Sequence, residues 1–225
     1  RDDACSPDAC SGETEATTQE KDSLMTSDDG QNTFQNTMNV SRETIERLKI
    51  YESLLLKWNP AINLVGQSTI SQVWIRHFLD SAQLWNLRPK NTKTWLDLGS
   101  GGGFPGLIVA ILAVEYDPSL SVTLVESDAR KASFLLKVSQ ETGITPKIAI
   151  ERAEKLPPAA ADVISARALA PVSKIFEYVT RLSNDNTICL LSKGENHESE
   201  LTEARKNWKF ELQKIPSITD VNGVI

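Results

Sequence analysis

One glycine-rich segment, residues 97–106, restricts the fold of this chain more than any other part of its sequence. It reads DLGSGGGFPG and follows a short apolar run, residues 94–98, that is typical of a buried strand. The segment leads into an apolar stretch, residues 105–114, that predicts a helix with Pro105 in its first turn. Glycines at such a junction permit positive φ angles and let a ligand approach the backbone closely. A strand, a glycine-rich loop and a helix in this order are typical of nucleotide-binding α/β folds.

The rest of the C-terminal part alternates between strand-like and helix-like segments. Alternation of this kind implies a parallel sheet with helices on both of its faces. Residues 91–225 are therefore predicted to form a Rossmann-like α/β domain with a doubly wound, mostly parallel sheet. After the first strand, the expected strands are residues 121–126, 147–151, 162–166, 187–192 and a last one near 208–214, and the expected helices are residues 128–142, one after Pro171, and 197–206.

Two segments of different character precede this domain. Residues 1–39 are rich in Ser, Thr, Asp, Glu, Gln and Asn and contain few large apolar side chains, so they are predicted to be a disordered polar tail. Residues 40–90 are predicted to be a small N-terminal cap of two helices. The first begins after Ser41, a typical helix N-cap, and ends at Asn59-Pro60, and the second begins after Ser68.

The net charge of −6 is concentrated in the polar tail. Residues 1–40 contain nine acidic and two basic residues, a net charge of −7, whereas the rest of the chain carries +1. A near-neutral body neither indicates nor excludes a nucleic-acid partner, because binding needs only a local basic patch.

The sequence lacks several features that are typical of other classes of protein. No apolar run is long enough to span a bilayer, and the acidic N-terminal region has no hydrophobic stretch typical of a signal peptide. The three cysteines form no C-x-x-C pair and no cluster with histidine, so neither a metal site nor a disulfide framework is indicated. We therefore expect a cytoplasmic monomer with no metal and with no membrane or DNA partner.

Two carboxylates, Asp97 and Glu126, decide which ligand the glycine-rich loop favours. Glu126 ends the second expected strand, where an acidic side chain can bind a ribose diol. Asp97 would repel the pyrophosphate of a nicotinamide dinucleotide but would attract the sulfonium and α-ammonium groups of S-adenosylmethionine. The chain also lacks a second domain to position a hydride acceptor. The loop, Gly101 included, is therefore predicted to bind S-adenosylmethionine, and the chain to be a methyltransferase.

Six motifs occur in the order found in one known family. They are LKWNPAINLVG (56–66), RHFLDS (76–81), DLGSGGGFPG (97–106), LVESDARKASFL (124–135), SARA (165–168) and SKG (192–194). Through these motifs the chain resembles the bacterial ribosomal RNA small-subunit methyltransferase G family, also called glucose-inhibited division protein B. The resemblance covers about residues 41–225. It implies the Rossmann-like fold of the class I methyltransferases that depend on S-adenosylmethionine.

The resemblance also implies an activity and a set of contacts. The activity is methylation of one guanine of small-subunit (16S) ribosomal RNA to 7-methylguanosine, on naked RNA or on a small-subunit particle. Guanine N7 holds an exposed lone pair, so this reaction needs no general base and no catalytic residue is assigned. A methyltransferase for a small molecule or a protein is the alternative, and a non-catalytic module that docks on the ribosome is a further one. The implied cofactor contacts are Gly99, Phe104, Ala153, Glu154 and Arg167.

Polar residues that flank the expected cleft are candidates for RNA contacts. Basic side chains near the strand ends are expected to contact phosphate groups. His77 and Asp80 lie three residues apart on the second helix, and each is either an RNA contact or a structural residue. Arg130 and Lys131 are either RNA contacts or part of a solvated helix face. The candidates are Lys57, Arg76, His77, Asp80, Arg130, Lys131 and Lys193.

Overall fold

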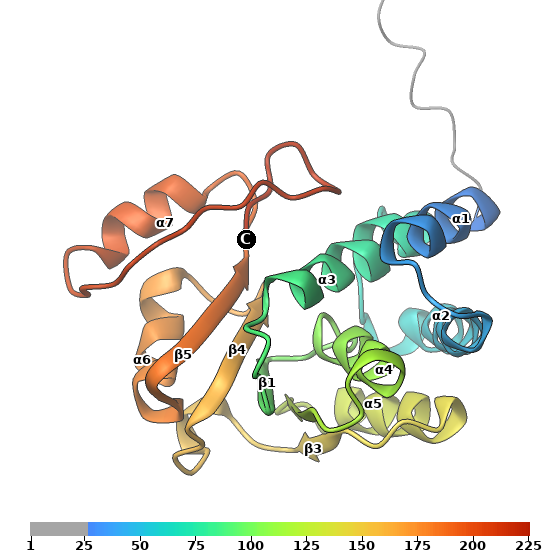
Figure 1. Ribbon diagram of the computed structural model, residues 1–225, viewed down its shortest axis with the longest axis horizontal. Helices are drawn as coiled ribbons and strands as arrows, with labels where there is room; N and C mark the ends of the chain where they lie inside the picture. The colour runs from blue at the N-terminus through green and yellow to red at the C-terminus, as the bar shows by residue number, and fades with distance from the viewer. Residues whose placement is uncertain (1–26) are drawn as a thin grey trace, which may run out of the picture.

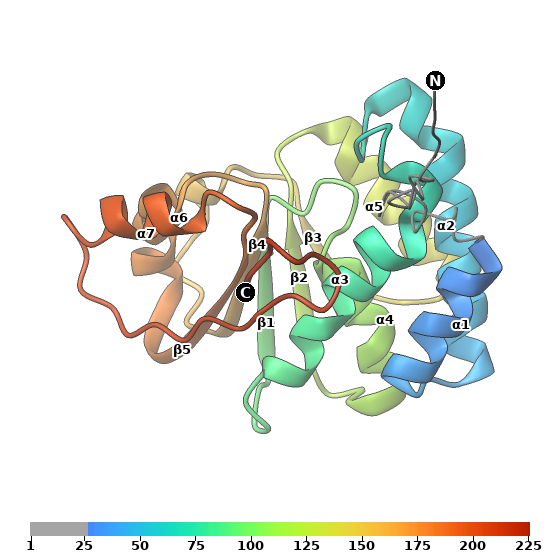
Figure 2. The ribbon, with the colours of Figure 1, turned by 90° about the horizontal axis from the view of Figure 1, so that it is seen from above.

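The computed structural model describes residues 27–225, and its centre is a five-stranded parallel sheet (Figures 1 and 2). The strand order is β3-β2-β1-β4-β5, and every neighbouring pair is parallel. The predicted doubly wound α/β fold is therefore confirmed. Strand order reverses at β1, which pairs with β2 on one side and β4 on the other, so the carboxyl end of β1 is a topological switch point. The strands are β1 (Thr94–Leu98), β2 (Ser121–Val125), β3 (Lys147–Ala149), β4 (Ala161–Arg167) and β5 (Ser183–Ser192).

Helices cover both faces of the sheet, and Figure 1 shows them on its two sides. Helices α4 and α5 pack on one face together with the N-terminal helices, and α6 packs on the other. Side chains alternate along β1, so Trp95 belongs to the first core and Leu96 to the second. Helix α7 packs against α6 at the β5 side of the sheet. The helices are α4 (Gly106–Tyr116), α5 (Ala129–Thr142), α6 (Val172–Leu182) and α7 (His197–Ala204).

The predicted cap consists of one regular helix, α2 (Arg42–Ile62), and a segmented helical stretch, residues 70–87. Ser41 caps α2 as expected, because its side chain accepts a hydrogen bond from the N–H of Thr44. The predicted end at Asn59-Pro60 is wrong, since α2 continues to Ile62. Asn59 explains the difference: its Oδ1 accepts the N–H groups of Leu64 and Val65 at 2.7 and 2.9 Å and so stabilises the turn that follows the helix.

The second part of the cap changes its helical type along its length. It passes from a 3-10 turn through a π-helical stretch and a short α-helix to a second 3-10 segment. The cap and the sheet share a single hydrophobic core, in which the cap residues Tyr51 and Phe78 pack with Trp95 and Phe104 of the sheet domain. The cap is therefore part of the same folding unit as the sheet. Its segments are Ile70–Gln72, Trp74–Leu79, α3 (Asp80–Ala82) and Gln83–Leu87.

The predicted disordered tail, residues 1–39, is wrong for its last third, which forms α1 (Ser27–Met38). Residues 1–26 lie outside the described part of the chain. Helix α1 is polar apart from Phe34 and Met38, which lie four residues apart and therefore share one face. Phe34 is fully buried, with its ring edge-on to Trp74 at 5.8 Å between centroids. Composition suggested disorder because only two large apolar side chains hold this helix on the body.

The C-terminal segment also differs from expectation. Residues 208–214 form no strand, and the chain instead returns across the end of β5. Val224 forms isolated antiparallel bridges with Lys193 and Pro216. This return places Ser217 and Asp220 beside the cap, where they contact Asp80 and Arg76.

Replacing Phe34 with alanine should lower the free energy of unfolding by about 3–5 kcal/mol, because the change leaves a cavity between α1 and Trp74. Chemical denaturation of the variant and the parent measures this difference. Asn36→Ala is the control, since Asn36 lies on the exposed side of the same helix. A loss below about 1 kcal/mol for Phe34→Ala would show that α1 does not pack on the body in solution.

Candidate functional site

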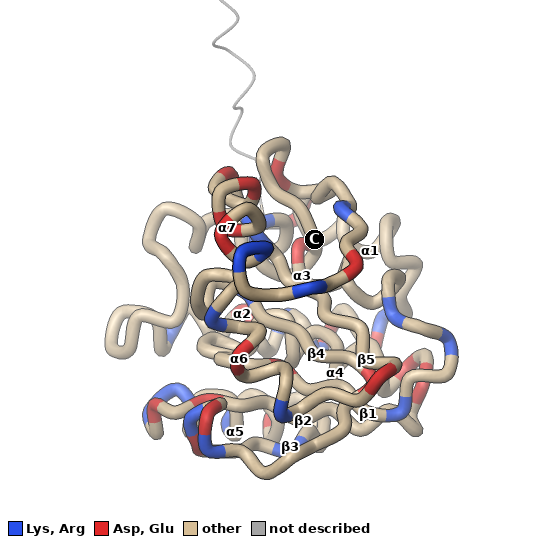
Figure 3. The backbone as a smooth tube through the Cα atoms, turned by 90° about the vertical axis from the view of Figure 1, so that its left-hand side faces the viewer, with Lys and Arg blue, Asp and Glu red and all other residues tan. Residues whose placement is uncertain are grey.

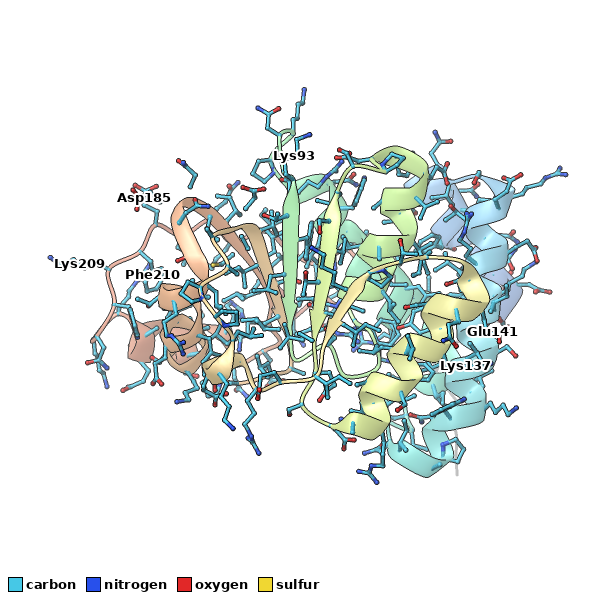
Figure 4. All side chains as sticks on the ribbon, turned by 90° about the horizontal axis from the view of Figure 1, so that it is seen from below. Lys93, Lys137, Glu141, Asp185, Lys209 and Phe210 are labelled. Carbon is cyan, nitrogen blue, oxygen red and sulfur yellow. The ribbon has the colours of Figure 1, made fainter. Side chains whose placement is uncertain are left out.

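A cleft of about 410 Å³ lies at the carboxyl ends of the central strands. Lys93 and Asp185 mark the other end of the sheet, where β1 and β5 begin (Figure 4). The glycine-rich loop forms one wall of the cleft, and residues that follow β2, β3 and β4 form the others. Its lining includes Gly99–Gly102, Phe104, Glu126, Ser127, Lys131, Glu151–Glu154, Arg167–Leu169 and Tyr178.

Gly99 cannot be replaced by another residue without disturbing this cleft. Its φ angle is +66°, a conformation that residues with a side chain rarely adopt. A Cβ atom at this position would also lie 2.5 Å from Cδ1 of Leu169, which covers the loop from the segment after β4. The absence of a side chain at Gly99 therefore keeps both the loop conformation and the wall of the cleft.

Glu126 binds the loop from the end of β2. Its Oε2 accepts the N–H of Gly101 at 2.9 Å, and its Oε1 accepts the N–H of Asp128 at 2.7 Å. The residue is mostly buried but lines the cleft. Its carboxylate is thus held at the cleft wall in a fixed position, which is the arrangement expected for a group that accepts hydrogen bonds from a ligand.

Asp97 lies beneath the loop and is completely buried. Its carboxylate accepts the N–H of Gly106 at 3.1 Å and the hydroxyl of Ser165 at 2.7 Å, and so joins the start of α4 to β4. Burial raises the pKa of Asp97 to about 6, against the opposing effect of these hydrogen bonds. Asp97 does not line the cleft, so its charge would act on a ligand only through the loop.

Arg167, at the end of β4, connects the sheet to the cap. Its guanidinium donates to Oδ2 of Asp80 at 3.2 Å and to Nδ1 of His77 at 3.0 Å. It also lies over the ring of Phe104, 4.8 Å from the centroid. One cation therefore fixes two cap residues and one loop residue relative to each other.

His77 has both ring nitrogens engaged. Because a guanidinium only donates, Nδ1 accepts from Arg167, and the proton is on Nε2, which donates to Oγ1 of Thr69 at 2.8 Å. The ring stacks on Phe104 with 5.1 Å between centroids, and the residue is buried. Burial and the charges of Arg167 and Arg76 lower the pKa of His77 to about 3. Of the two interpretations left open by the sequence, this geometry favours the structural one.

Tyr51, on α2, is a positioning residue that the sequence interpretation missed. Its hydroxyl donates a hydrogen bond to the carbonyl of Gly102 in the loop. Its ring stacks between Phe78 and Phe104, at 5.1 and 5.4 Å between centroids. The sequence feature that could have revealed this role is a tyrosine hydroxyl on the otherwise apolar, buried face of the predicted helix. Leu169 and Tyr178 also line the cleft and were missed, because neither belongs to a recognisable motif.

A second cleft, of about 460 Å³, adjoins the first. The two share Arg167, Ala168 and Leu169 as a common wall. The C-terminal segment closes the side of the second cleft that faces the cap. Its lining comprises Asp80, Arg167–Pro171, Ser192–Gly194, Glu200, Ser217, Asp220 and Gly223–Ile225.

Comparison with known proteins assigns the chain to a family. Residues 44–223 match the family described as rRNA small subunit methyltransferase G. A protein of that name from Cereibacter sphaeroides is 48% identical over 188 residues, which are 84% of this chain and 90% of the relative. One from Rhodospirillum centenum is 48% identical over 192 residues, 85% of this chain and 87% of the relative. The chain belongs to the rRNA small subunit methyltransferase G family. It is therefore an enzyme, and the predicted family membership is confirmed.

Two solved structures support the fold alone. A protein from Klebsiella pneumoniae described as an O-methyltransferase has a TM-score of 0.54 and 16% identity, over 86% of this chain and 93% of that one. A methyltransferase from Geobacter sulfurreducens has a TM-score of 0.53 and 14% identity, over 80% and 85% of the two chains. The predicted Rossmann-like methyltransferase fold is confirmed. Within the described residues, no helix is long and apolar enough to cross a membrane.

The basic residues proposed for phosphate contacts are mostly paired with carboxylates. Figure 3 shows basic and acidic residues interspersed along the side of α6 and α7. Lys57 and Lys131 take part in none of the ion pairs among residues 27–225, and Lys57 is exposed on α2. An ion-paired side chain attracts phosphate less strongly than a free one. The paired candidates are Arg76 with Asp220 (3.2 Å), Arg130 with Asp128 (2.9 Å) and Lys193 with Glu200 (2.8 Å).

The lowered pKa of His77 predicts how stability depends on pH. At pH values between about 3 and 6.5, His77 binds a proton in the unfolded chain but not in the folded protein, because folding lowers its pKa from 6.5 to about 3. The unfolding free energy contributed by His77 therefore falls as the pH drops below about 6.5. In His77→Gln this titration is absent, so its unfolding free energy should depend less on pH, by roughly 1 kcal/mol per unit between about pH 4.5 and 6. Urea unfolding at several pH values tests this, and equal slopes in both proteins would contradict it.

Proposed function

We propose that this enzyme transfers a methyl group from S-adenosylmethionine to N7 of one guanine in small-subunit (16S) ribosomal RNA. The observation that carries the proposal is the match of residues 44–223 to the rRNA small subunit methyltransferase G family. The two clefts, which meet at Arg167–Leu169, give adjacent places for a cofactor and a base. The first cleft would hold the cofactor and the second the base. A substrate of this kind would place the enzyme in the cytoplasm, on RNA or on a small-subunit particle.

The residues of the first cleft fit S-adenosylmethionine. Gly99 lines the cleft with a backbone that carries no side chain, and the fixed carboxylate of Glu126 can accept hydrogen bonds from a ribose diol. Ala153 and Glu154, which follow β3, also line this cleft. When bound, the cofactor supplies a methyl group on a positively charged sulfur.

The chain's own residues then have to orient and shield the reacting groups. Guanine N7 needs no deprotonation, and His77, whose ring nitrogens are both engaged, offers no free base. Methylation moves positive charge onto the purine, so an unpaired cation nearby would oppose it. Both cations that line the second cleft are paired with carboxylates, Arg167 with Asp80 and Lys193 with Glu200. Rate enhancement would come mainly from holding N7 in line with the methyl group and excluding water.

Methyl transfer from labelled cofactor tests this proposal. The purified enzyme is incubated with small-subunit RNA, with assembled small subunits, with a total protein extract and with small metabolites. We expect label in RNA, at a single 7-methylguanosine located by chemical cleavage at methylated guanines. Label in protein or in a small molecule, with none in RNA, would support the alternative substrates and overturn the proposal.

The matched control is Gly99→Val, whose side chain collides with Leu169 and strains the loop. It should abolish binding of S-adenosylmethionine in titration calorimetry and abolish methyl transfer. Circular dichroism should show a folded protein. Normal cofactor affinity in this variant would mean that the cofactor does not lie against the loop.

Lys57 is one of the two phosphate-contact candidates, with Lys131, that form no ion pair among residues 27–225. It is exposed on α2, and Leu64, just beyond the end of that helix, lines the cofactor cleft. Lys57→Glu should raise the KM for RNA several-fold at low salt, and the difference should shrink as salt is added. Lys49→Glu, nearer the start of the same helix, is the control for net charge. Equal effects of the two substitutions would show that no specific contact exists at Lys57.

A further inference from the structure

One wall of the second cleft is formed by the segment that begins at Leu169, and two polar side chains are bonded along it in sequence. Leu169 borders both clefts. The carbonyl of the next residue, Ala170, accepts a hydrogen bond from Nζ of Lys193 at 2.6 Å. Two residues further on, the N–H of Val172 donates to Oε2 of Glu200 at 3.0 Å. Along this segment Lys193 is therefore attached one residue after Leu169, and Glu200 three residues after it.

Lys193 and Glu200 each retain unused hydrogen-bonding capacity. The ammonium group of Lys193 has three N–H donors, of which one goes to Ala170, and its Nζ forms an ion pair with Oε2 of Glu200 at 2.8 Å. Oε2 of Glu200 thus has two partners, the N–H of Val172 and the ammonium of Lys193, whereas Oε1 has none among the described residues. Both side chains line the cleft, with 11% and 26% of their surface exposed. The wall therefore offers one free donor beside one free acceptor.

The other two acidic side chains of this cleft, Asp80 and Asp220, already accept hydrogen bonds through both of their carboxylate oxygens. Asp80 accepts hydrogen bonds from Thr219 and Gln83 through Oδ1 and from Arg167 through Oδ2. Asp220 accepts from the backbone N–H of Asn222 and from Arg76. Of the three ion pairs at the cleft, Lys193–Glu200 keeps a wholly free carboxylate oxygen.

We propose that Lys193 and Glu200 recognise the Watson–Crick edge of the target guanine. Lys193 donates to guanine O6, and Oε1 of Glu200 accepts the N1–H, so that an adjacent donor and acceptor meet their complements. A phosphate group fits this place poorly, because the carboxylate of Glu200 repels it. The assignment rests on the proposed function and changes the expected role of Lys193 from a phosphate contact to a base contact.

The order of Lys193 and Glu200 along the wall also determines the orientation of guanine in the second cleft. In guanine, O6 and N7 lie on the same side of the ring system. With O6 at Lys193, N7 is directed toward Leu169 and the cofactor cleft. Adenine carries a donor at position six and an acceptor at N1, so it can pair with the same two residues only if it is turned over. That orientation moves its N7 away from the cofactor cleft. Hypoxanthine keeps O6 and N1–H and should bind as guanine does.

A conservative substitution tests the acceptor. In Glu200→Gln the amide oxygen can keep the bonds to Lys193 and Val172, but the NH₂ group opposes the N1–H of guanine. We expect kcat/KM for ribosomal RNA to fall on the order of 10- to 100-fold, with cofactor affinity and melting temperature unchanged. The control is Glu198→Gln on the same helix, whose carboxylate pairs with Lys214 outside the cleft. Equal activity of the two variants would overturn the assignment.

A binding experiment on the unaltered enzyme tests the assignment without any variant or turnover. Guanosine, inosine and adenosine 5′-monophosphates are titrated into the complex with S-adenosylhomocysteine and followed by ligand-detected NMR. We expect the guanosine and inosine nucleotides to bind at least several-fold tighter than the adenosine nucleotide, and the preference to disappear in Glu200→Gln. Equal binding of all three would overturn the assignment. Failure to methylate RNA despite a guanine preference would count against the proposed function only.

Discussion

The arrangement of both clefts depends on the bonds made by Arg167. Its guanidinium holds Asp80 and His77 of the cap and covers Phe104 of the loop, and its backbone ends β4. This one cation therefore joins the cap, the glycine-rich loop and the sheet where the two clefts meet. With only 18% of its side chain exposed, its charge needs a nearby partner, and Asp80 supplies it. Removing Asp80 would leave a partly buried charge unpaired at the boundary between the two clefts.

Paired charges are common around the second cleft. Arg167, Arg76 and Lys193 each lie beside a carboxylate, so the cleft is polar without a strong net charge. Such a surface suits recognition of a neutral base through hydrogen bonds better than attraction of the phosphate backbone. Under the proposed function, affinity for RNA would come from exposed basic residues at some distance from the base, and Lys57 is a candidate. The proposal thus divides base recognition and backbone binding between different parts of the surface.

Most of the fold followed from the sequence because the decisive signals are local. The glycine-rich loop, the strand–helix alternation and the Ser41 cap all depend on neighbouring residues, and the structure confirms them. Helix α1 was missed because two buried side chains, Phe34 and Met38, outweigh a polar composition only once Trp74 and the rest of the core are present. At the site, motifs placed Gly99 and Glu126 at the cleft. The roles of Tyr51 and Leu169, and the pairing of Lys193 with Glu200, depend on contacts between distant segments that no local pattern contains.

The shared aromatic core has a consequence for how the chain folds during synthesis. A chain of aromatic rings in contact runs from α1 to the glycine-rich loop, in the order Phe34, Trp74, Phe78, Tyr51 and Phe104. The cap is translated first, yet most of its apolar surface has no partner until α4 and α5 have been made. Strand β1 likewise has one unpaired edge until β4, some 70 residues later, leaves the ribosome. The N-terminal third of the nascent chain therefore stays exposed for much of translation, and this interval is when the protein is most open to chaperones and to aggregation.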